Sequence, residues 1–266
     1  MATAWLAVTV HDPAGRMLAG VERDLEALGG VFAGVAVAGT DATDGRIFDA
    51  LGGLSCVSSR HAADGGRIGW ARRESVRLAI DAGAPAVLYS DLDHVLRWVE
   101  ADRGELELCL AAQPGTDLLV VGRSDAAFAS SPARLQETER LVNHVYGLIT
   151  GRTWDLMFAI RRLSGGAARA IVEQCSEDSL ANDVTWPLLA EALGFSVGYF
   201  AADGLSYLTT SDFDEDRDRR DGDPASWIHR IEIAAGHARA MVRFLPTGPG
   251  RRAGADRGRQ GPRSPR

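Results

Sequence analysis

The sequence contains no lysine, so all 29 of its basic residues are arginines. A lysine amine is required to bind phosphate in a Walker-A loop and to form a Schiff base with a carbonyl substrate. The absence of lysine therefore excludes both mechanisms. The chain is also rich in alanine, glycine and arginine, so a compositional bias accounts for much of this absence.

A surplus of positive charge is lacking as well, because the formal net charge is −7. Proteins that bind nucleic acid need a broad basic surface, so we do not expect nucleic acid as a partner. The three cysteines, Cys56, Cys109 and Cys175, are widely spaced, which predicts reduced thiols. No secretory leader is recognisable, and no segment approaches the ~20 apolar residues that span a bilayer. We therefore expect a soluble, cytoplasmic protein without a transmembrane segment.

Short apolar runs alternate with helical patterns over the first 90 residues. The runs at 5–10, 31–38, 55–58 and 86–90 predict strands, and apolar residues at helical spacing predict helices over 17–28 and 70–82. This alternation predicts an α/β fold, with a mostly parallel sheet between two layers of helices.

The second half of the chain is less regular. The expected elements are strands over 117–122 and 195–200, and helices over 135–148, 164–174, 182–193 and 227–244. We expect a solvated loop at 217–223 and a disordered tail at 246–266, which is mostly Gly, Pro and Arg. The remaining residues, 1–245, are then expected to form one domain.

The most informative motif is Asp91-Leu92-Asp93, which follows the apolar run that ends at Ser90. A strand that ends in this way delivers two carboxylates to the carboxyl edge of a sheet, where open α/β folds bind their ligands. Carboxylates together with substrate phosphate oxygens are the preferred ligands of Mg²⁺ and Mn²⁺. The motif therefore predicts a metal-bound nucleotide or other phosphate ester. The alternative is two solvated acids at the start of a helix.

Four motifs in order resemble the GT-A-fold glycosyltransferases, particularly the family-two type. They are Thr43-Asp44-Gly45, the Gly-rich segment from Asp64 that leads to Ala71-Arg72-Arg73, the Asp91-Leu92-Asp93 motif, and Asn182-Asp183 with the following Gly194-Phe195. The resemblance covers roughly residues 4–200. It implies a three-layer, Rossmann-related sheet, with a nucleotide-sugar half at 1–100 and an acceptor half at 101–245.

The resemblance also implies a function, the transfer of a sugar from a nucleoside-diphosphate donor to a hydroxyl acceptor with Mg²⁺ or Mn²⁺. Asp91 and Asp93 would bind the metal, and Asp91 would also contact the ribose or diphosphate. Arg72 would contact the base or diphosphate. Asp183 would be the catalytic base that deprotonates the acceptor. Arg72 and Asp183 can equally be explained as a helix-start arginine and a helix cap.

Other positions fit the resemblance less closely. His11 and Asp12, which follow the first strand, would lie near the nucleoside. The paired acids that usually precede the second-strand turn are replaced by Gly39 and Thr40, which leaves Asp41 and Asp44 as candidate donor contacts.

Further along the chain, the usual Glu before the catalytic Asp is Asn182. These departures leave open a divergent branch, a retaining mechanism and a loss of activity. His94 could lie in the outer shell of the metal, and either His229 or His237 could complete its ligands. A homodimer is also left open.

Three other functions share some of these features. Asp91-Leu92-Asp93-His94-Val95 also fits the nucleophile strand of haloacid-dehalogenase-like phosphatases, but that strand normally opens the domain. A nucleotidyltransferase would need a glycine-rich first loop, which the 10–15 segment lacks. A non-catalytic nucleotide-sugar-binding protein on the same scaffold remains open.

Overall fold

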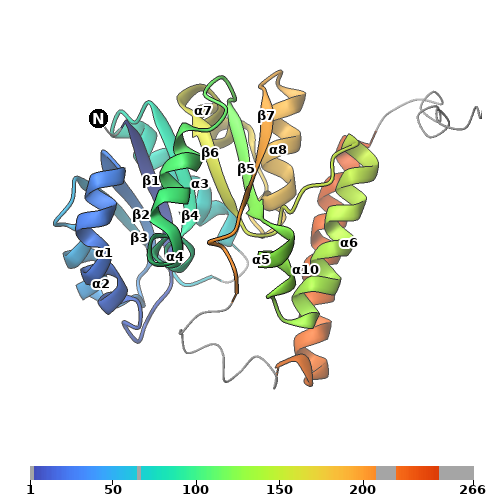
Figure 1. The fold of residues 1–266 in the computed structure, drawn as a ribbon, viewed down its shortest axis with the longest axis horizontal. Coiled ribbons are helices and arrows are strands. Elements are labelled where there is room, and N and C mark those ends of the chain that lie inside the picture. The colour runs from blue at the N-terminus through green and yellow to red at the C-terminus, as the bar shows by residue number, and fades with distance from the viewer. Residues whose placement is uncertain (1–2, 65–66, 208–219, 246–266) are drawn as a thin grey trace, which may run out of the picture.

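The protein is described by a computed structural model that covers residues 3–64, 67–207 and 220–245. The expected tail at 246–266, the glycine pair at 65–66 and the 217–219 part of the expected loop lie outside these residues. The strands are β1 (Ala4–Val10), β2 (Gly34–Thr40), β3 (Cys56–His61), β4 (Ala86–Asp91), β5 (Leu118–Arg123), β6 (Ile160–Ser164) and β7 (Val197–Ala202) (Figure 1).

The strands form one seven-stranded sheet in the order β3-β2-β1-β4-β6-β5-β7. Strand β6 runs antiparallel to both of its neighbours, and every other pairing is parallel. The carboxyl ends of β1, β4 and β5 therefore lie on the same edge of the sheet, which is the edge that binds ligands in open α/β folds.

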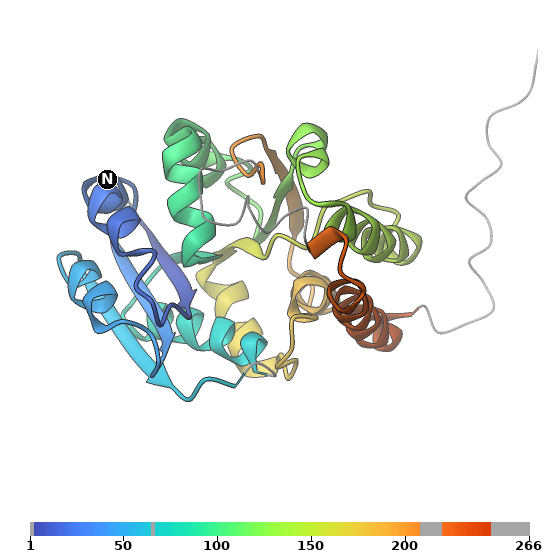
Figure 2. The ribbon, with the colours of Figure 1, turned by 90° about the horizontal axis from the view of Figure 1, so that it is seen from below.

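Helices cover both faces of the sheet, so the fold has three layers (Figure 2). The helices are α1 (Leu18–Val31), α2 (Gly45–Leu51), α3 (Ile68–Asp81), α4 (Leu92–Ala111), α5 (Asp125–Ala129), α6 (Ala133–Thr150), α7 (Gly165–Gln174), α8 (Asn182–Ala192), α10 (Pro224–Met241) and the 3₁₀ turn η1 (Val242–Phe244). One core lies between the sheet and α1, α2 and α4. The second lies between the opposite face and α3, α6, α7, α8 and α10. The predicted α/β class is confirmed.

Local sequence signals set several helix ends. Ser164 caps α7 by accepting a hydrogen bond from the backbone N–H of Ala167, as its position before the helical pattern predicted. Gly151 and Gly194 follow α6 and α8 with φ of 75° and 86°, a conformation that glycine adopts without a Cβ penalty.

Strand β6 is the element that the sequence pattern did not predict, because its centre is Arg161-Arg162. Both side chains are buried. The Arg161 guanidinium donates to the carbonyls of Ile160, Leu156 and Asp183 at 2.7–2.8 Å. The Arg162 guanidinium donates to four carbonyls at the end of α4 and just after it. Buried donors that are satisfied in this way allow a charged pair inside a sheet.

The described part of the expected solvated loop, residues 220–223, is mostly exposed, and its two aspartates fix the starts of two helices. Asp221 accepts hydrogen bonds from the backbone N–H of Ala133 and from Arg134, which fixes the start of α6. Asp223 caps α10 by accepting from the N–H groups of Ala225 and Ser226. Both aspartates therefore act as helix caps. Among the described helices, none has the length and apolar content required to cross a membrane.

Candidate functional site

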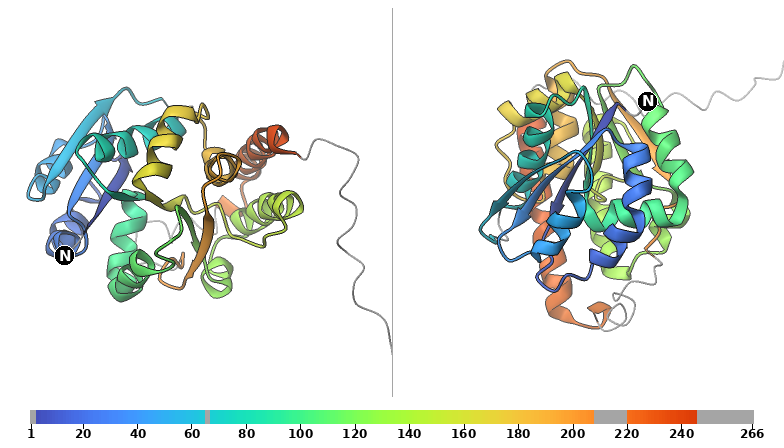
Figure 3. Two further views of the ribbon diagram at one scale, coloured as in Figure 1. Left: turned by 90° about the horizontal axis from the view of Figure 1, so that it is seen from above. Right: turned by 90° about the vertical axis from the view of Figure 1, so that its left-hand side faces the viewer.

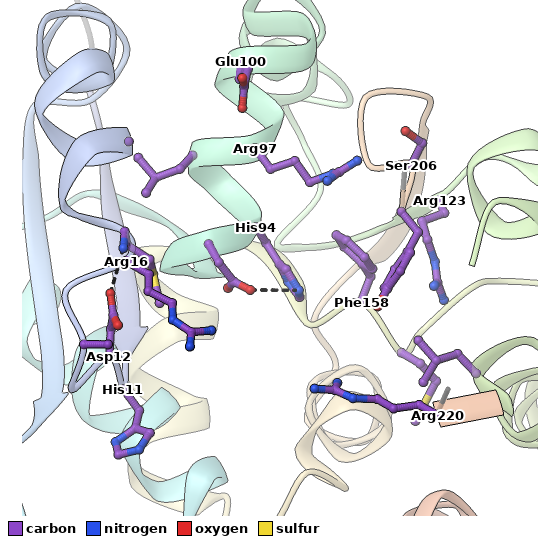
Figure 4. A pocket seen from close by; sticks show the side chains of 18 of the residues that line it. His11, Asp12, Arg16, His94, Arg97, Glu100, Arg123, Phe158, Ser206 and Arg220 are labelled. Atoms are coloured by element: carbon purple, nitrogen blue, oxygen red, sulfur yellow. Dashed lines mark hydrogen bonds and ion pairs between the residues drawn. The ribbon is translucent and has the colours of Figure 1, made fainter. Parts of the chain in front are cut away.

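A cavity of about 1200 Å³ opens at the carboxyl ends of β1, β4 and β5 (Figure 4). Its walls come from the loop after β1, the first turns of α1 and α4, and the N-terminal parts of α6 and α10. Its charged and titratable lining residues are Arg16, Arg23, Arg97, Arg123, Arg134, Arg220, Arg230, His11, His94, His229, Asp12, Asp93, Glu100 and Glu139. The arginines outnumber the carboxylates in a chain whose net charge is −7, so this cavity suits an anionic ligand.

Asp93 lies in the first turn of α4 and lines the cavity with an exposed carboxylate. Its one ionic contact within the described residues is the imidazole Nε2 of His94, 4.0 Å from its Oδ2. The His94 ring stacks on Phe158 with a centroid distance of 4.2 Å. Asp93 is therefore a carboxylate with oxygens available to a cation.

The described residues contain no cluster of three or more His, Cys, Asp or Glu side chains that could hold a metal ion by themselves. Mg²⁺ often binds through one or two carboxylates together with substrate phosphate oxygens, so Asp93 fits such a shared site. Of the two late histidines, His229 lines the cavity. His237 does not, because it is fully buried, with Nδ1 2.8 Å from the Ile233 carbonyl and Nε2 3.5 Å from Asp183 Oδ2.

Asp91 ends β4 and is held from three sides. The parallel register places Thr9 beside it, and the Thr9 hydroxyl donates to Asp91 Oδ1 at 2.6 Å. The Tyr89 hydroxyl donates to the same oxygen, and Arg72 donates to Oδ2 at 3.0 Å. Burial opposes ionisation of Asp91, but the charge of Arg72 and these hydrogen bonds outweigh it and lower its pKa to about 2.

Arg72 lies between two other predicted site residues, and its contact with the base or diphosphate stays a prediction. Besides Asp91, the Arg72 guanidinium donates to Asp183 Oδ1 at 2.8 Å and to Asn182 Oδ1 at 2.9 Å. Arg72 is 4% exposed and does not line the cavity. It therefore connects α3 with the end of β4 and the start of α8.

Asp183 lies in this buried network and away from the cavity lining. Burial opposes its ionisation, yet the charge of Arg72 and a contact with His237 hold the pKa of Asp183 below its usual 3.8. A general base works best when its pKa lies near the operating pH and its oxygens reach the substrate. Neither condition is met in this conformation, and the catalytic assignment of Asp183 stays a prediction.

His11 and Asp12 come directly after β1 and line the cavity (Figure 4), and their contact with a nucleoside stays a prediction. The His11 Nδ1 lies 2.7 Å from the Thr40 hydroxyl, which leaves Nε2 free of this contact. Asp12 is buried and accepts from the Met17 backbone N–H at 2.7 Å. Asp12 therefore shapes the start of α1, whereas His11 presents its exposed ring to the cavity.

Asp41 and Asp44 do not line the cavity. Asp44 caps α2 and forms an ion pair with Arg46, which lowers the pKa of its carboxyl below 3.8. Asp41 is exposed just after β2. The structure therefore does not bring these two residues together with His11 and Asp93.

The opposite wall contains a second buried network that the sequence prediction missed. The Arg123 guanidinium donates to both oxygens of Asp155 at 2.8 and 3.0 Å, to the Ser131 hydroxyl at 2.9 Å and to Glu139. Glu139 also accepts from Arg230 at 2.8 Å. Arg123 could have been found, because it follows the apolar run 118–122 in the same way that the acid pair follows β4.

No protein-family model matches this chain, and no curated protein matches its sequence. Solved structures do resemble it. Glucosyl-3-phosphoglycerate synthase from M. tuberculosis superposes with a TM-score of 0.55 at 11% identity over 92% of this chain and 82% of that chain. The same enzyme in complex with Mn²⁺, uridine diphosphate and phosphoglyceric acid gives a TM-score of 0.55 at 10% identity over 92% and 80%.

A third structure is the M. tuberculosis enzyme with Mn²⁺, UDP-glucose and glycerol 3-phosphate. It gives a TM-score of 0.54 at 11% identity over 92% of this chain and 81% of that chain. At this identity the likeness establishes the fold alone. The resemblance suggested by the sequence motifs is therefore confirmed at the level of architecture, and the chain has the three-layer, mostly parallel α/β fold of GT-A nucleotide-sugar glycosyltransferases.

Proposed function

We propose that this protein transfers a sugar from a nucleoside-diphosphate donor to a hydroxyl acceptor, with Mg²⁺ or Mn²⁺ as cofactor. The observation that carries the proposal is the exposed carboxylate of Asp93 on the wall of an arginine-rich cavity at the carboxyl edge of the sheet. A divalent cation shared by this carboxylate and a diphosphate would neutralise charge on the leaving nucleoside diphosphate. The complexes of the structural neighbours with Mn²⁺ and UDP or UDP-glucose support the same chemistry.

The donor side is served by residues from three elements. Asp93 would hold the metal, and Asp91, fixed by Thr9 and Arg72, would accept hydrogen bonds from a donor hydroxyl. Because the pKa of Asp91 is lowered to about 2, it is ionised and acts as an acceptor at neutral pH. Arg16, exposed on the wall next to His11, is a further candidate partner for the diphosphate.

We assign Asp183 a positioning role. It binds the same guanidinium as Asp91, and its own oxygens face Arg72 and His237 rather than the cavity. Its charge therefore helps to hold Arg72, and Arg72 in turn holds Asp91. This arrangement does not require Asp183 to take a proton from the acceptor, so it is compatible with a retaining mechanism.

The acceptor is proposed to be a small anion that carries a hydroxyl group. The wall opposite Asp93 contains Arg134 and Arg230, whose guanidiniums each pair with one carboxylate among the described residues. Nε of Arg230 is buried without a hydrogen-bond partner among the described residues. Guanidinium groups recognise carboxylate and phosphate through paired hydrogen bonds. The neighbours' ligands phosphoglyceric acid and glycerol 3-phosphate belong to this chemical class.

A phosphatase of the haloacid-dehalogenase type is less well supported. Its first Asp must attack phosphorus with a free carboxylate oxygen. Both oxygens of Asp91 accept hydrogen bonds, from Thr9 and Tyr89 on one side and from Arg72 on the other. The geometry instead favours a fixed acceptor at this position.

The proposal is tested by thermal denaturation with sugar nucleotides, in the presence and absence of Mn²⁺. A ligand at about 100 times its Kd stabilises the native state by about 2.7 kcal/mol, which raises Tm by about 5 °C or more in a protein of this size. We expect this rise only when both UDP-glucose (or another sugar nucleotide) and Mn²⁺ are present. Asp93→Ala should abolish it, whereas the matched variant Asp49→Ala, an exposed acid on α2, should retain it.

Two outcomes would contradict the proposal. An Asp93→Ala protein with an unchanged Mn²⁺ dependence would remove Asp93 as the metal ligand. A protein that is stabilised by no sugar nucleotide with either metal would exclude donor binding. Release of the nucleoside diphosphate in the presence of hydroxy acids or sugar phosphates then separates an enzyme from a protein that only binds the donor.

A further inference from the structure

An apolar stripe runs along the solvent-facing side of α10 and continues just beyond it. Its members are separated by three and four residues in strict alternation, and they are Ile228, Ile231, Ala235, Ala238, Val242 and Leu245. The four large side chains are 58%, 57%, 62% and 50% exposed, in chain order. This spacing is the heptad pattern by which two helices pack along a common seam.

The side of α10 that faces the protein is a different one. Ala234, His237 and Met241 are buried there, against the core that α6 and α8 also share. The stripe is therefore additional to the packing of α10 on its own chain. Figures 2 and 3 show α10 at the outer end of the molecule, far from β3 and the N-terminal helices, where a second chain can approach it.

We propose that this stripe is the interface of a homodimer in which α10 packs antiparallel against α10 of a second copy. A two-fold axis between Ala235 and Ala238 would place Ile228 opposite Leu245 of the other copy, and Ile231 opposite Val242. Ala235 and Ala238 would meet at the centre. Each contact is then apolar on both sides, and the central alanines let the two helices approach closely.

The charges beside the stripe select this orientation. Glu232 and Arg239 are exposed, lie one heptad apart on the same flank, and have no ion-pair partner within the described residues. In the antiparallel arrangement Glu232 of each copy lies near Arg239 of the other, so two ion pairs form. A parallel arrangement would place these flanks of the two copies on opposite sides of the seam, so neither ion pair would form. The mixed signs also differ from the basic flanks of helices that bind anionic lipid.

The experiment is sedimentation of the full chain across the micromolar range. We expect a particle of twice the 28.4 kDa chain mass. Ile231→Asp should weaken association by about tenfold or more, because it places a charge opposite Val242 within the buried seam. Leu108→Asp is the matched control, since Leu108 is 67% exposed on α4 and lies outside the stripe. Compared at concentrations where the wild type is monomeric, both variants should keep the wild-type Tm, because both side chains are exposed in the single chain.

A charge exchange tests the orientation. Glu232→Arg alone and Arg239→Glu alone should each weaken the dimer, and the double variant that carries both changes should restore it. In a parallel dimer these side chains of the two copies would lie on opposite sides of the seam, and each single variant would associate at the wild-type level.

Three results would overturn the proposal. They are a monomer at every concentration, a dimer that Ile231→Asp leaves intact, and a chain that becomes dimeric only when residues 246–266 are removed, since the stripe would then be covered by its own terminus. Binding of the wild-type monomer to phosphatidylserine vesicles, lost in Ile231→Asp, would assign the stripe to a lipid surface instead.

Discussion

Two buried arginines, Arg72 and Arg123, stand behind the two sides of the cavity and differ in what their carboxylate partners face. Arg72 joins Asp183, which is 5% exposed, to Asp91, which is 22% exposed at the edge of the sheet. Arg123 joins Asp155 and Glu139, which are 8% and 5% exposed. The first network is thus exposed to solvent at Asp91, whereas the carboxylates of the second are closed off from solvent, although Arg123 and Glu139 line the cavity.

The difference in exposure of the carboxylates indicates that the two buried guanidinium groups have different roles. A buried guanidinium is costly to desolvate and needs good hydrogen-bond geometry to compensate. In the Arg123 network both carboxylates are used for that compensation, and the guanidinium also packs 5.0 Å from the Phe158 ring centroid. In the Arg72 network one carboxylate keeps an exposed surface. We infer that Arg72 orients a ligand-binding carboxylate and that Arg123 supports the cavity wall.

The largest expected effect is the loss of stability when either arginine is replaced by an apolar residue. Because this loss is similar for both arginines, a binding measurement is needed to distinguish them. Arg72→Leu and Arg123→Leu should each lower the free energy of unfolding by about 3–5 kcal/mol, because each removes the buried guanidinium that pairs with two carboxylates. Urea denaturation followed by circular dichroism measures this loss.

The lysine variants test the comparison in proteins that fold. Arg72→Lys and Arg123→Lys retain the charge but lose the planar fork that binds two partners at once. Arg72→Lys should weaken Mn²⁺-dependent binding of the sugar nucleotide, and Arg123→Lys should leave it within about twofold, measured by calorimetric titration. Equal losses in both variants would show that the two networks do not differ in this way.

The sequence predicted the donor side of the fold better than the acceptor side, for a local reason. The strands β1, β2 and β4 are continuous apolar runs, and the polar residues that follow β1 and β4 are adjacent to them in sequence. Parallel pairing then brings His11 and Asp93 to one edge without further information. Strand β6 has no such signal, because Arg161 and Arg162 are polar by type and each is accommodated partly by carbonyl groups far away in the chain.

Local sequence patterns also fail to predict the arginines of the cavity wall. Arg134 and Arg230 reach it from α6 and α10, and their partners Asp221 and Glu139 lie 87 and 91 residues away in sequence. No spacing rule connects residues at such separations, so only the packed structure identifies them. For Asp183 the sequence predicted the position but not the chemical role. A motif placed it correctly at the start of α8, but burial and the contact with Arg72 decide what its carboxylate can do.

An intermediate effect is expected for Asp183→Asn. The amide keeps the size of the side chain but removes the charge that faces Arg72 and His237, so we expect a loss of about 3 kcal/mol in unfolding free energy. If Asp183 positions Asp91 through Arg72, the affinity for the sugar nucleotide should fall as well. Asp178→Asn, at a more exposed carboxylate that pairs with Arg73, should change neither property appreciably.

The catalytic-base interpretation makes a different prediction for the same variant. Donor affinity would be unchanged, and kcat would fall by roughly 10²-fold or more because the base is lost. Measuring the donor Kd and kcat separately therefore decides between the two. Unchanged affinity together with such a fall in kcat would restore Asp183 as the base.

The smallest effect is expected inside the closed network, at Glu139. Burial raises the pKa of Glu139 above 4.5 despite the charges of Arg123 and Arg230, whereas the charge of Arg123 lowers the pKa of Asp155 below 3.8 despite burial. The folded protein thus shifts the equilibrium at 139 toward the neutral form and at 155 toward the ionised form. Glu139→Gln should cost about 1 kcal/mol or less, and Asp155→Asn about 3 kcal/mol.

The signs of these shifts also fix the dependence on pH. The stability contributed by Asp155 is present above its unfolded pKa of 3.8 and is lost as the pH falls through its lowered folded pKa. Glu139 acts in the opposite direction, because a raised folded pKa means that protonation stabilises the native state as the pH falls through that value. Urea denaturation from pH 7 to pH 3 should therefore show a weaker acid loss in Asp155→Asn than in wild type, and a stronger one in Glu139→Gln. If both variants followed the wild-type curve, the two carboxylates would not titrate as the buried partners of Arg123.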